Sequence, residues 1–183
     1  KPVIITEPFN SSLQIIKAVC RGVGLSIIPV EDIKRKICKH AVSVIGFTIE
    51  EDEARENAKK LIDQLNPAAI IFIEKAGRNN ENVYHNQSGF DISAYHAKVE
   101  HLLTEARQKG ILTIGIGDGG NEVGMGVIES TVRKYVPYGE RCQCPCKGGI
   151  AAASRVDVLV TATISNWGGY ALSGMLAKIK EKP

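Results

Sequence analysis

Two carboxylates and an amide are concentrated in one glycine-rich stretch of the chain, residues 111–126. Asp118, Asn121 and Glu122 could bind a cation or move a proton there, because carboxylates attract positive charge and accept protons. Six glycines surround them: Gly115, Gly117, Gly119, Gly120, Gly124 and Gly126. Such a density predicts a backbone that turns sharply or lets a ligand approach its N–H groups. The stretch is therefore the candidate active or binding site; the alternative is that Asp118 and Asn121 only cap the following helix.

A second polar group directly follows an earlier apolar run. Glu74 could act as a general base, and Lys75 or Arg78 could clamp a carboxylate. Tyr84 and His85 lie in the polar loop that comes next and could donate a proton. The alternatives are a surface ion pair at a strand end and a histidine with a structural role.

Apolar runs alternate with amphipathic segments along the chain. Near-continuous Val, Ile and Leu runs predict strands at 3–6, 25–30, 41–47, 68–73, 156–161 and at the start of the glycine-rich stretch. Helical spacing predicts helices at 10–22, 48–66, 91–110 and 166–180, with another between the glycine-rich loop and residue 135.

Three segments carry more specific expectations. Asp91 is expected to cap the helix that it begins. The basic residues between 34 and 40 are expected to form a solvated helix face. The last helix is expected to turn its apolar residues inward: Leu172, Met175, Leu176 and Ile179. Asn166 opens that helix, directly after a strand, where a polar group can line a pocket.

The alternation predicts an α/β fold. Buried strands separated by helices favour a doubly wound, Rossmann-like, mostly parallel sheet with helices on both faces. Residues 1–183 show no internal linker or repeat, which predicts a single domain. The chain opens almost directly into an apolar run at Val3, so we expect it to be a piece of a longer protein. In such a sheet the loops at neighbouring strand ends converge, which would bring Glu74 and Asp118 together.

Composition argues against several classes of partner. Lys and Arg total 23 against 20 for Asp and Glu, and aromatic residues are only 5% of the chain, so a nucleic-acid surface is not expected. No apolar run approaches the length of a membrane span. Residues 115–120 match the G-x-G-x-x-G pattern, but two acids near a pyrophosphate and the late position disfavour a dinucleotide. A small-molecule partner remains.

Five cysteines are present. Cys20 and Cys38 are expected to behave as small buried hydrophobic residues. Cys142, Cys144 and Cys146 form a C-x-C-x-C cluster that lacks the spacing of a zinc module, which predicts a reduced loop and no metal.

The glycine-rich stretch and the polar segment after Glu74 both resemble a known family. Residues 74–78, 84–86, 91–93 and above all 115–126, which read G-I-G-D-G-G-N-E-V-G-M-G, resemble the C-terminal domain of the D-glutamate cyclase family. The likeness runs from about Val42 to the end of the chain. It implies conversion of D-glutamate to 5-oxo-D-proline with loss of water, no organic cofactor, an amino acid as the small-molecule substrate and a location in the mitochondrial matrix.

The resemblance also implies roles for particular residues. The catalytic candidates, a base for the substrate amine and an acid for the departing hydroxide, are Glu74, Asp118, Glu122 and His85. The candidates for binding the substrate or its oxyanion are Lys75, Arg78, Tyr84, Gly117, Gly119, Gly120, Asn121 and Asn166. Two alternatives use the same loop: a non-catalytic module that senses a small ligand, and a hydrolase with a divalent metal on Asp118 and Glu122.

Overall fold

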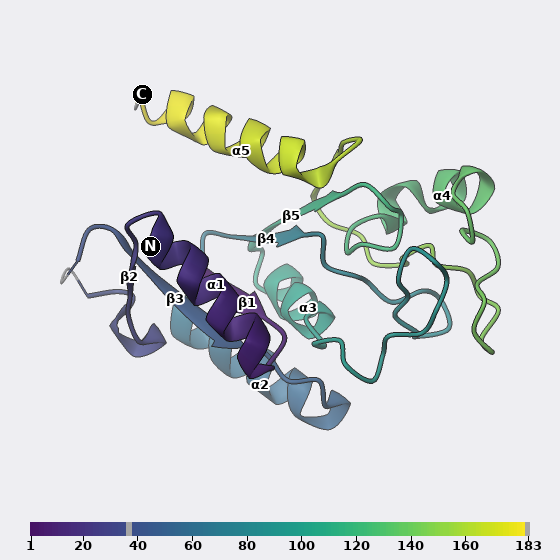
Figure 1. Ribbon diagram of the computed structural model, residues 1–183, viewed down its shortest axis with the longest axis horizontal. Coiled ribbons are helices and arrows are strands. Elements are labelled where there is room, and N and C mark those ends of the chain that lie inside the picture. Colours follow the sequence, from purple (N-terminus) through teal and green to yellow (C-terminus); the bar gives the residue numbers. More distant parts are fainter. Residues whose placement is uncertain (36–37, 182–183) are drawn as a thin grey trace. The chain divides into compact units, whose positions relative to one another are not determined.

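Two compact units make up the structure, a computed structural model that describes residues 1–35 and 38–181. The first unit contains residues 1–58 and 95–99, and the second contains residues 59–94 together with the chain from 100 onward. Each holds a parallel three-stranded sheet flanked by helices, so the predicted α/β class and parallel strands are confirmed (Figure 1). The single domain expected for residues 1–183 stays a prediction.

The first unit is built on a sheet of order β1–β3–β2. Its strands are β1 (Val3–Thr6), β3 (Ala41–Gly46) and β2 (Ser26–Ile27). Helix α1 (Asn10–Gly22) packs on β3 with the apolar face that the sequence predicts. The core formed there contains Cys20, Val42 and Val44, with Leu13 and Ile16 packed against them. Helix α2 (Glu51–Leu65) follows β3, and the boundary between the two units falls within it, after Ala58.

The second unit carries the predicted site residues. Its sheet has the order β4–β5–β6, with β4 (Ala69–Ile73), β5 (Leu112–Gly117) and β6 (Val158–Thr161) all parallel. Helices α3 (Glu100–Gln108) and α5 (Ser165–Ile179) both contact β5 and lie on opposite sides of β4 and β5 in Figure 1. A 3₁₀ turn (Gly126–Ile128) and α4 (Glu129–Tyr135) follow the glycine-rich loop.

Strand register brings the ends of these three strands to one edge. Ile73 pairs with Ile116, and Gly117 pairs with Thr161. The residues that immediately follow β4, β5 and β6 therefore emerge side by side, as expected for the carboxyl ends of parallel strands. None of the described helices is both long enough and apolar enough to span a membrane.

The helix predicted from Asp91 begins nine residues later than expected. Asp91 accepts a hydrogen bond from the backbone N–H of Ser93 at 2.8 Å and so closes a tight turn instead of capping a helix. Further along, the N–H of Lys98 donates to the carbonyl of Thr48 at 3.0 Å. These local and long-range bonds compete with helix formation, and regular helix starts only at Glu100.

Two segments of the first unit contain less regular secondary structure than the sequence predicts. The strand predicted at 25–30 is confined to Ser26–Ile27, and Pro29, which has no N–H, precedes a 3₁₀ turn over Val30–Asp32. The basic segment 34–40 contains no helix in the part that the structure describes, and Lys36 lies outside the described residues.

Helix α5 does not bury its apolar residues as predicted. Met175, Leu176 and Ile179 are 56%, 46% and 72% exposed, and Leu172 is half-buried. Contacts between α5 and the sheet come instead from small residues such as Gly168, which packs on Ile116. Helical periodicity identifies an apolar stripe, but it does not say whether this part of the chain covers that stripe.

Close packing at Gly115 gives a prediction about stability. A Cβ on Gly115, in β5, would lie 2.5 Å from the carbonyl oxygen of Val123, whereas a Cβ on Gly174, in α5, would meet nothing within 4 Å. We expect Gly115→Ala to destabilise the protein by about 1–3 kcal/mol through steric overlap, and Gly174→Ala to stabilise it by up to about 1 kcal/mol through helix propensity. Urea unfolding followed by circular dichroism measures both; equal midpoints would contradict the packing described here.

Candidate functional site

Three carboxylates meet at the carboxyl edge of the second sheet. Glu74 directly follows β4, Asp118 directly follows β5, and Glu122 lies in the glycine-rich loop. One carboxylate oxygen from each residue lies within 4.8 Å of the others. The structure therefore brings together the three acids that the sequence singled out, all within the second unit.

Glu122 is buried and acts as the centre of its own loop. The residue is only 3% exposed, yet both of its carboxylate oxygens accept hydrogen bonds. Oε1 accepts hydrogen bonds from the N–H groups of Asp118 and Gly119 at 2.9 and 2.7 Å, and Oε2 accepts one from Gly120 at 2.7 Å. These N–H groups, which were expected to hold an oxyanion, bind an internal carboxylate in this structure.

The glycines make this arrangement sterically feasible. A Cβ on Gly117 would lie 2.8 Å from the Glu122 carboxyl carbon, so a side chain there would displace the acid. Gly120 has φ of 92°, a left-handed conformation that glycine adopts readily. The sequence prediction of a sharp turn is confirmed, and the carboxylate that approaches the loop N–H groups is that of Glu122.

Glu74 is held in a strained backbone conformation. Its φ is 53°, in the left-handed region that a residue with a long side chain rarely enters, at a cost of about 1–3 kcal/mol. Its N–H donates to the carbonyl of Ile116, and its carboxylate accepts a hydrogen bond from the Ser165 hydroxyl. Strain at a strand end beside other acids is typical of a functional position.

The charge environment shifts the acidity of Glu74. Although the residue as a whole is exposed, the partial burial of its carboxyl group raises the pKa of Glu74 above the usual value, the Ser165 hydrogen bond opposes that rise, and the nearby charges of Glu122 and Asp118 reinforce it. The protonated form of Glu74 is therefore accessible at higher pH than for an ordinary glutamate.

Asp118 is exposed, and two groups orient it. Its Oδ2 accepts a hydrogen bond from the backbone N–H of Ser165 at 3.0 Å, and its Oδ1 accepts one from the Gln87 side-chain amide at 3.3 Å. Ser165 thus contacts both Asp118 and Glu74. Neither Ser165 nor Gln87 was predicted as a site residue, although Ser165 follows β6 at the same sheet edge and the strand-end argument that selected Glu74 applies to it.

Arg78 and Tyr84 are engaged with each other. The Arg78 Nε donates to the Tyr84 hydroxyl at 2.9 Å and lies 3.3 Å from a Glu100 carboxylate oxygen. Burial raises the pKa of Glu100, and hydrogen bonds from Ser154 and the Arg78 backbone together with the Arg78 charge oppose that rise. Tyr84 is buried, so these residues form an internal polar cluster.

Lys75 and Asn166 lie near the acids along the chain. The Lys75 carbonyl accepts a hydrogen bond from the N–H of Val123, which fixes the backbone beside the glycine-rich loop. Asn166 is exposed in the first turn of α5, next to Ser165.

His85 is placed among cysteines. It is buried, and its Nε2 lies 3.2 Å from the sulfur of Cys144. Burial lowers the pKa of His85, and the nearby Asp91 carboxylate offsets only part of that effect. The His85 carbonyl accepts a hydrogen bond from the Asn121 side-chain amide at 2.7 Å, so this residue supports the glycine-rich loop through its backbone.

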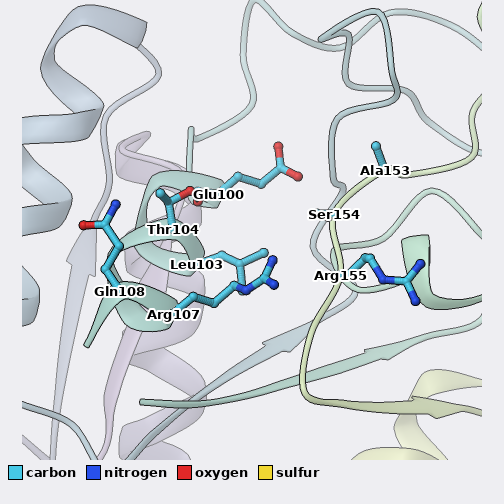
Figure 2. Close-up of a pocket in the computed structure, with 8 residues that line it drawn as sticks. All are labelled: Glu100, Leu103, Thr104, Arg107, Gln108, Ala153, Ser154 and Arg155. Carbon is cyan, nitrogen blue, oxygen red and sulfur yellow. Dashed lines mark hydrogen bonds between the residues drawn. The ribbon is translucent and has the colours of Figure 1, made fainter. Parts of the chain in front are cut away.

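A separate hollow of about 440 Å³ opens beside α3. Figure 2 shows α3 contributing one wall and the segment 153–155 the other. Its lining residues are Glu100, Leu103, Thr104, Arg107, Gln108, Ala153, Ser154 and Arg155. Glu74, Asp118 and Glu122 do not line it, and the sequence predicted none of its residues as part of a site.

Comparison with known proteins identifies the family. A family model described as D-glutamate cyclase-like, C-terminal, matches residues 1–183, which extends the likeness over the first forty residues. The chain belongs to this family. The human protein named D-glutamate cyclase, mitochondrial, is 35% identical over 105 residues, which cover 57% of this chain and 16% of that protein. The chain therefore spans a small part of the D-glutamate cyclase relative that it matches.

The acid cluster of this D-glutamate cyclase-like domain can attract a cation. Three carboxylates, of which Glu74 and Asp118 are exposed, create a local negative potential at the sheet edge. A substrate ammonium and a divalent metal ion both suit such a set of oxygen ligands.

Glu122 gives a prediction about loop stability. Glu122→Gln would place an amide NH₂ against at least one of the three backbone N–H donors. We expect a loss of about 1–3 kcal/mol, because a buried donor is then unsatisfied. Glu140→Gln, at an exposed position, is the matched control and should change stability by less than about 0.5 kcal/mol. Urea unfolding measures both; equal stability of the two variants would show that the loop does not depend on this carboxylate.

Proposed function

We propose that this domain cyclises D-glutamate to 5-oxo-D-proline. In this reaction the substrate amine nitrogen bonds to the side-chain carboxyl carbon, the bond from that carbon to a hydroxyl breaks, and water leaves. Family membership supports the proposal, and the observation that carries it is the convergence of Glu74, Asp118 and Glu122 at the ends of β4 and β5.

Glu74 is the residue that we assign as proton shuttle. The substrate ammonium must lose a proton before its nitrogen can attack, and an exposed carboxylate can take that proton. The departing hydroxyl must then gain one. The raised pKa of Glu74 suits both steps, because its carboxyl group holds a proton more readily than an ordinary glutamate.

Asp118 and Glu122 provide negative charge for the ammonium. Asp118 is exposed and oriented by Ser165 and Gln87, so it is the direct partner that we propose. Glu122 is a positioning residue in this scheme, because its oxygens hold the loop N–H groups. Binding the substrate in a folded conformation supplies the entropic part of the rate enhancement.

The substrate carboxylates require positive or donor groups. Lys75 follows Glu74 and Asn166 follows Ser165 in the chain, and we assign the α-carboxylate to these two predicted binding residues. Arg78 and Tyr84 would act indirectly, since they bind each other and Glu100. His85 is buried against Cys144, and the proposed scheme uses it to support Asn121 and not as the acid.

Removal of the Glu74 carboxylate tests the assignment. We expect Glu74→Gln to lower kcat for lactam formation by at least about 100-fold, because the proton acceptor is lost. Incubation with D-glutamate followed by chiral chromatography of 5-oxoproline measures the rate. Glu140→Gln, an exposed glutamate in the same unit, should retain full activity. Full activity of Glu74→Gln would remove Glu74 from the scheme, and absence of lactam with the unaltered chain would overturn the proposed reaction.

The Ser165 hydrogen bond predicts a change in pH dependence. This hydroxyl stabilises the ionised form of Glu74 and so lowers its pKa. In Ser165→Ala the pKa of Glu74 should rise further, because burial and the charges of Asp118 and Glu122 are then unopposed. The acid limb of the kcat/KM profile should therefore move to higher pH. An unchanged limb would mean that another group controls it.

The same three carboxylates also favour a second candidate, a metal-dependent hydrolase. Their oxygens are close enough to share one divalent ion, as the metal alternative for Asp118 and Glu122 requires. Hydrolytic activity that disappears after chelation and returns with Mg²⁺ or Mn²⁺ would favour this candidate. Lactam formation that persists in metal-free buffer favours the cyclase reaction without a divalent ion.

A mitochondrial location is part of the proposal. The human relative is named as a mitochondrial protein, and the family is shared. Fractionation of cells that express the full-length protein tests this location.

A further inference from the structure

A cluster of four metal-binding side chains lies outside the acid site. His85 and the three cysteines of the C-x-C-x-C motif each turn one ligand atom toward the others, and these four atoms all lie within 4.8 Å of one another. His85, Cys142 and Cys144 are buried, and Cys146 is half-buried. Thiols and an imidazole are the ligands of zinc sites.

The sulfur atoms lie slightly closer together than the ligands of a tetrahedral zinc site. Cys142 and Cys144 are 3.5 Å apart, and Cys146 lies 3.3 Å from each of them. Four-coordinate zinc with Zn–S bonds of about 2.3 Å separates its sulfur ligands by about 3.8 Å. A disulfide would bring two sulfurs to about 2.0 Å, and all three cysteines are free. No pair is therefore favoured as a bond, and the three sulfurs form one nearly equilateral triangle.

The imidazole supplies the fourth corner. His85 Nε2 lies 3.2 Å from the Cys144 sulfur and 3.5 Å from the Cys146 sulfur. A zinc ion with one nitrogen and three sulfur ligands has N–S separations of about 3.5 Å. His85 and Cys144 are 59 positions apart in the chain, so the fold, and not the local motif, assembles the set.

The surroundings of the cluster suit bound thiolates. The Asn79 side-chain amide lies 3.6 Å from the Cys146 sulfur and donates to the Gly149 carbonyl at 2.8 Å. Ile150 is buried with the cysteines, and Val83 and Val136 pack against them. A donor directed at a sulfur ligand and an apolar shell are outer features that orient ligands and exclude water around a metal.

We infer that His85, Cys142, Cys144 and Cys146 bind one structural zinc ion. All four coordination positions come from the protein, which is the closed arrangement of a structural site and leaves none for a substrate. Soft thiolate ligands in a tetrahedral S₃N set select zinc over magnesium or manganese. The sequence prediction of a metal-free loop rested on the C-x-C-x-C spacing alone and did not include His85.

The ion would connect two loops to the glycine-rich loop. One loop carries His85 and the other carries the three cysteines. The His85 carbonyl accepts a hydrogen bond from the Asn121 amide, one residue before Glu122. Zinc binding would therefore fix the backbone at His85, to which the Asn121 side chain is hydrogen-bonded. This inference does not depend on the proposed cyclase reaction.

Metal analysis of the purified chain tests the site. After expression in zinc-supplemented medium and removal of loosely held metal, we expect one zinc per chain. Replacement by Co²⁺ should give the visible bands of a tetrahedral ion and thiolate charge-transfer bands in the near ultraviolet. Cys144→Ser and His85→Asn should bind at least about 100-fold more weakly, since even loss of an outer-sphere partner costs 10–100-fold. Cys38→Ser removes a thiol outside the cluster and should bind normally.

Thiol titration of the unaltered chain keeps the test independent of variant folding. Cys142, Cys144 and Cys146 should be protected by the ion and become reactive as a chelator removes it, whereas the reactivity of Cys20, which is buried in the first unit, should not depend on zinc. Zinc content near zero would overturn the inference. So would a Cys144→Ser variant that binds zinc as tightly as Cys38→Ser, or a disulfide within the cluster in protein purified under reducing conditions.

Discussion

One buried carboxylate organises the candidate site. Glu122 accepts hydrogen bonds from three consecutive backbone N–H groups, and this requires the chain to curl tightly around it. A side chain at Gly117 would occupy the space of that carboxylate, so the glycine and the acid depend on each other. Charge-assisted hydrogen bonds of this kind are stronger than neutral ones, which explains how the loop compensates for burying an acid. The path of the loop then fixes where Asp118 and Asn121 are presented.

Repulsion between neighbouring carboxylates distinguishes this edge of the sheet from an ordinary strand end. Three carboxylates close together repel one another; the pKa of Glu74 is raised mainly by burial, and this repulsion adds to the rise. Ser165 relieves part of it, because its hydroxyl binds Glu74 while its backbone N–H binds Asp118. A positively charged group placed among the acids would relieve the rest. Such an arrangement attracts a cation, which in the proposed function is the substrate ammonium.

Local sequence patterns predicted what local interactions determine. The strand at Val3–Thr6, the helix at Asn10–Gly22 and the turn-rich loop around Glu122 follow from apolar periodicity and glycine content. Features that depend on distant partners were missed. The N–H of Lys98 binds the carbonyl of Thr48 and the helix expected from Asp91 starts only at Glu100, and His85 lies beside a cysteine 59 positions away. Ser165 could have been found from its place after β6, whereas its double contact with Glu74 and Asp118 needed the three-dimensional structure.

The backbone conformation at Glu74 is unfavourable for glutamate, whereas the proposed function requires a carboxylate there. A φ of 53° suits glycine or asparagine far better than glutamate. A directed-evolution library screened only for heat tolerance would therefore enrich those two residues at position 74 and discard the acid. Under the proposed function, engineering of this domain has to keep glutamate at position 74, whereas sequence-design methods guided by backbone preference alone will tend to replace it.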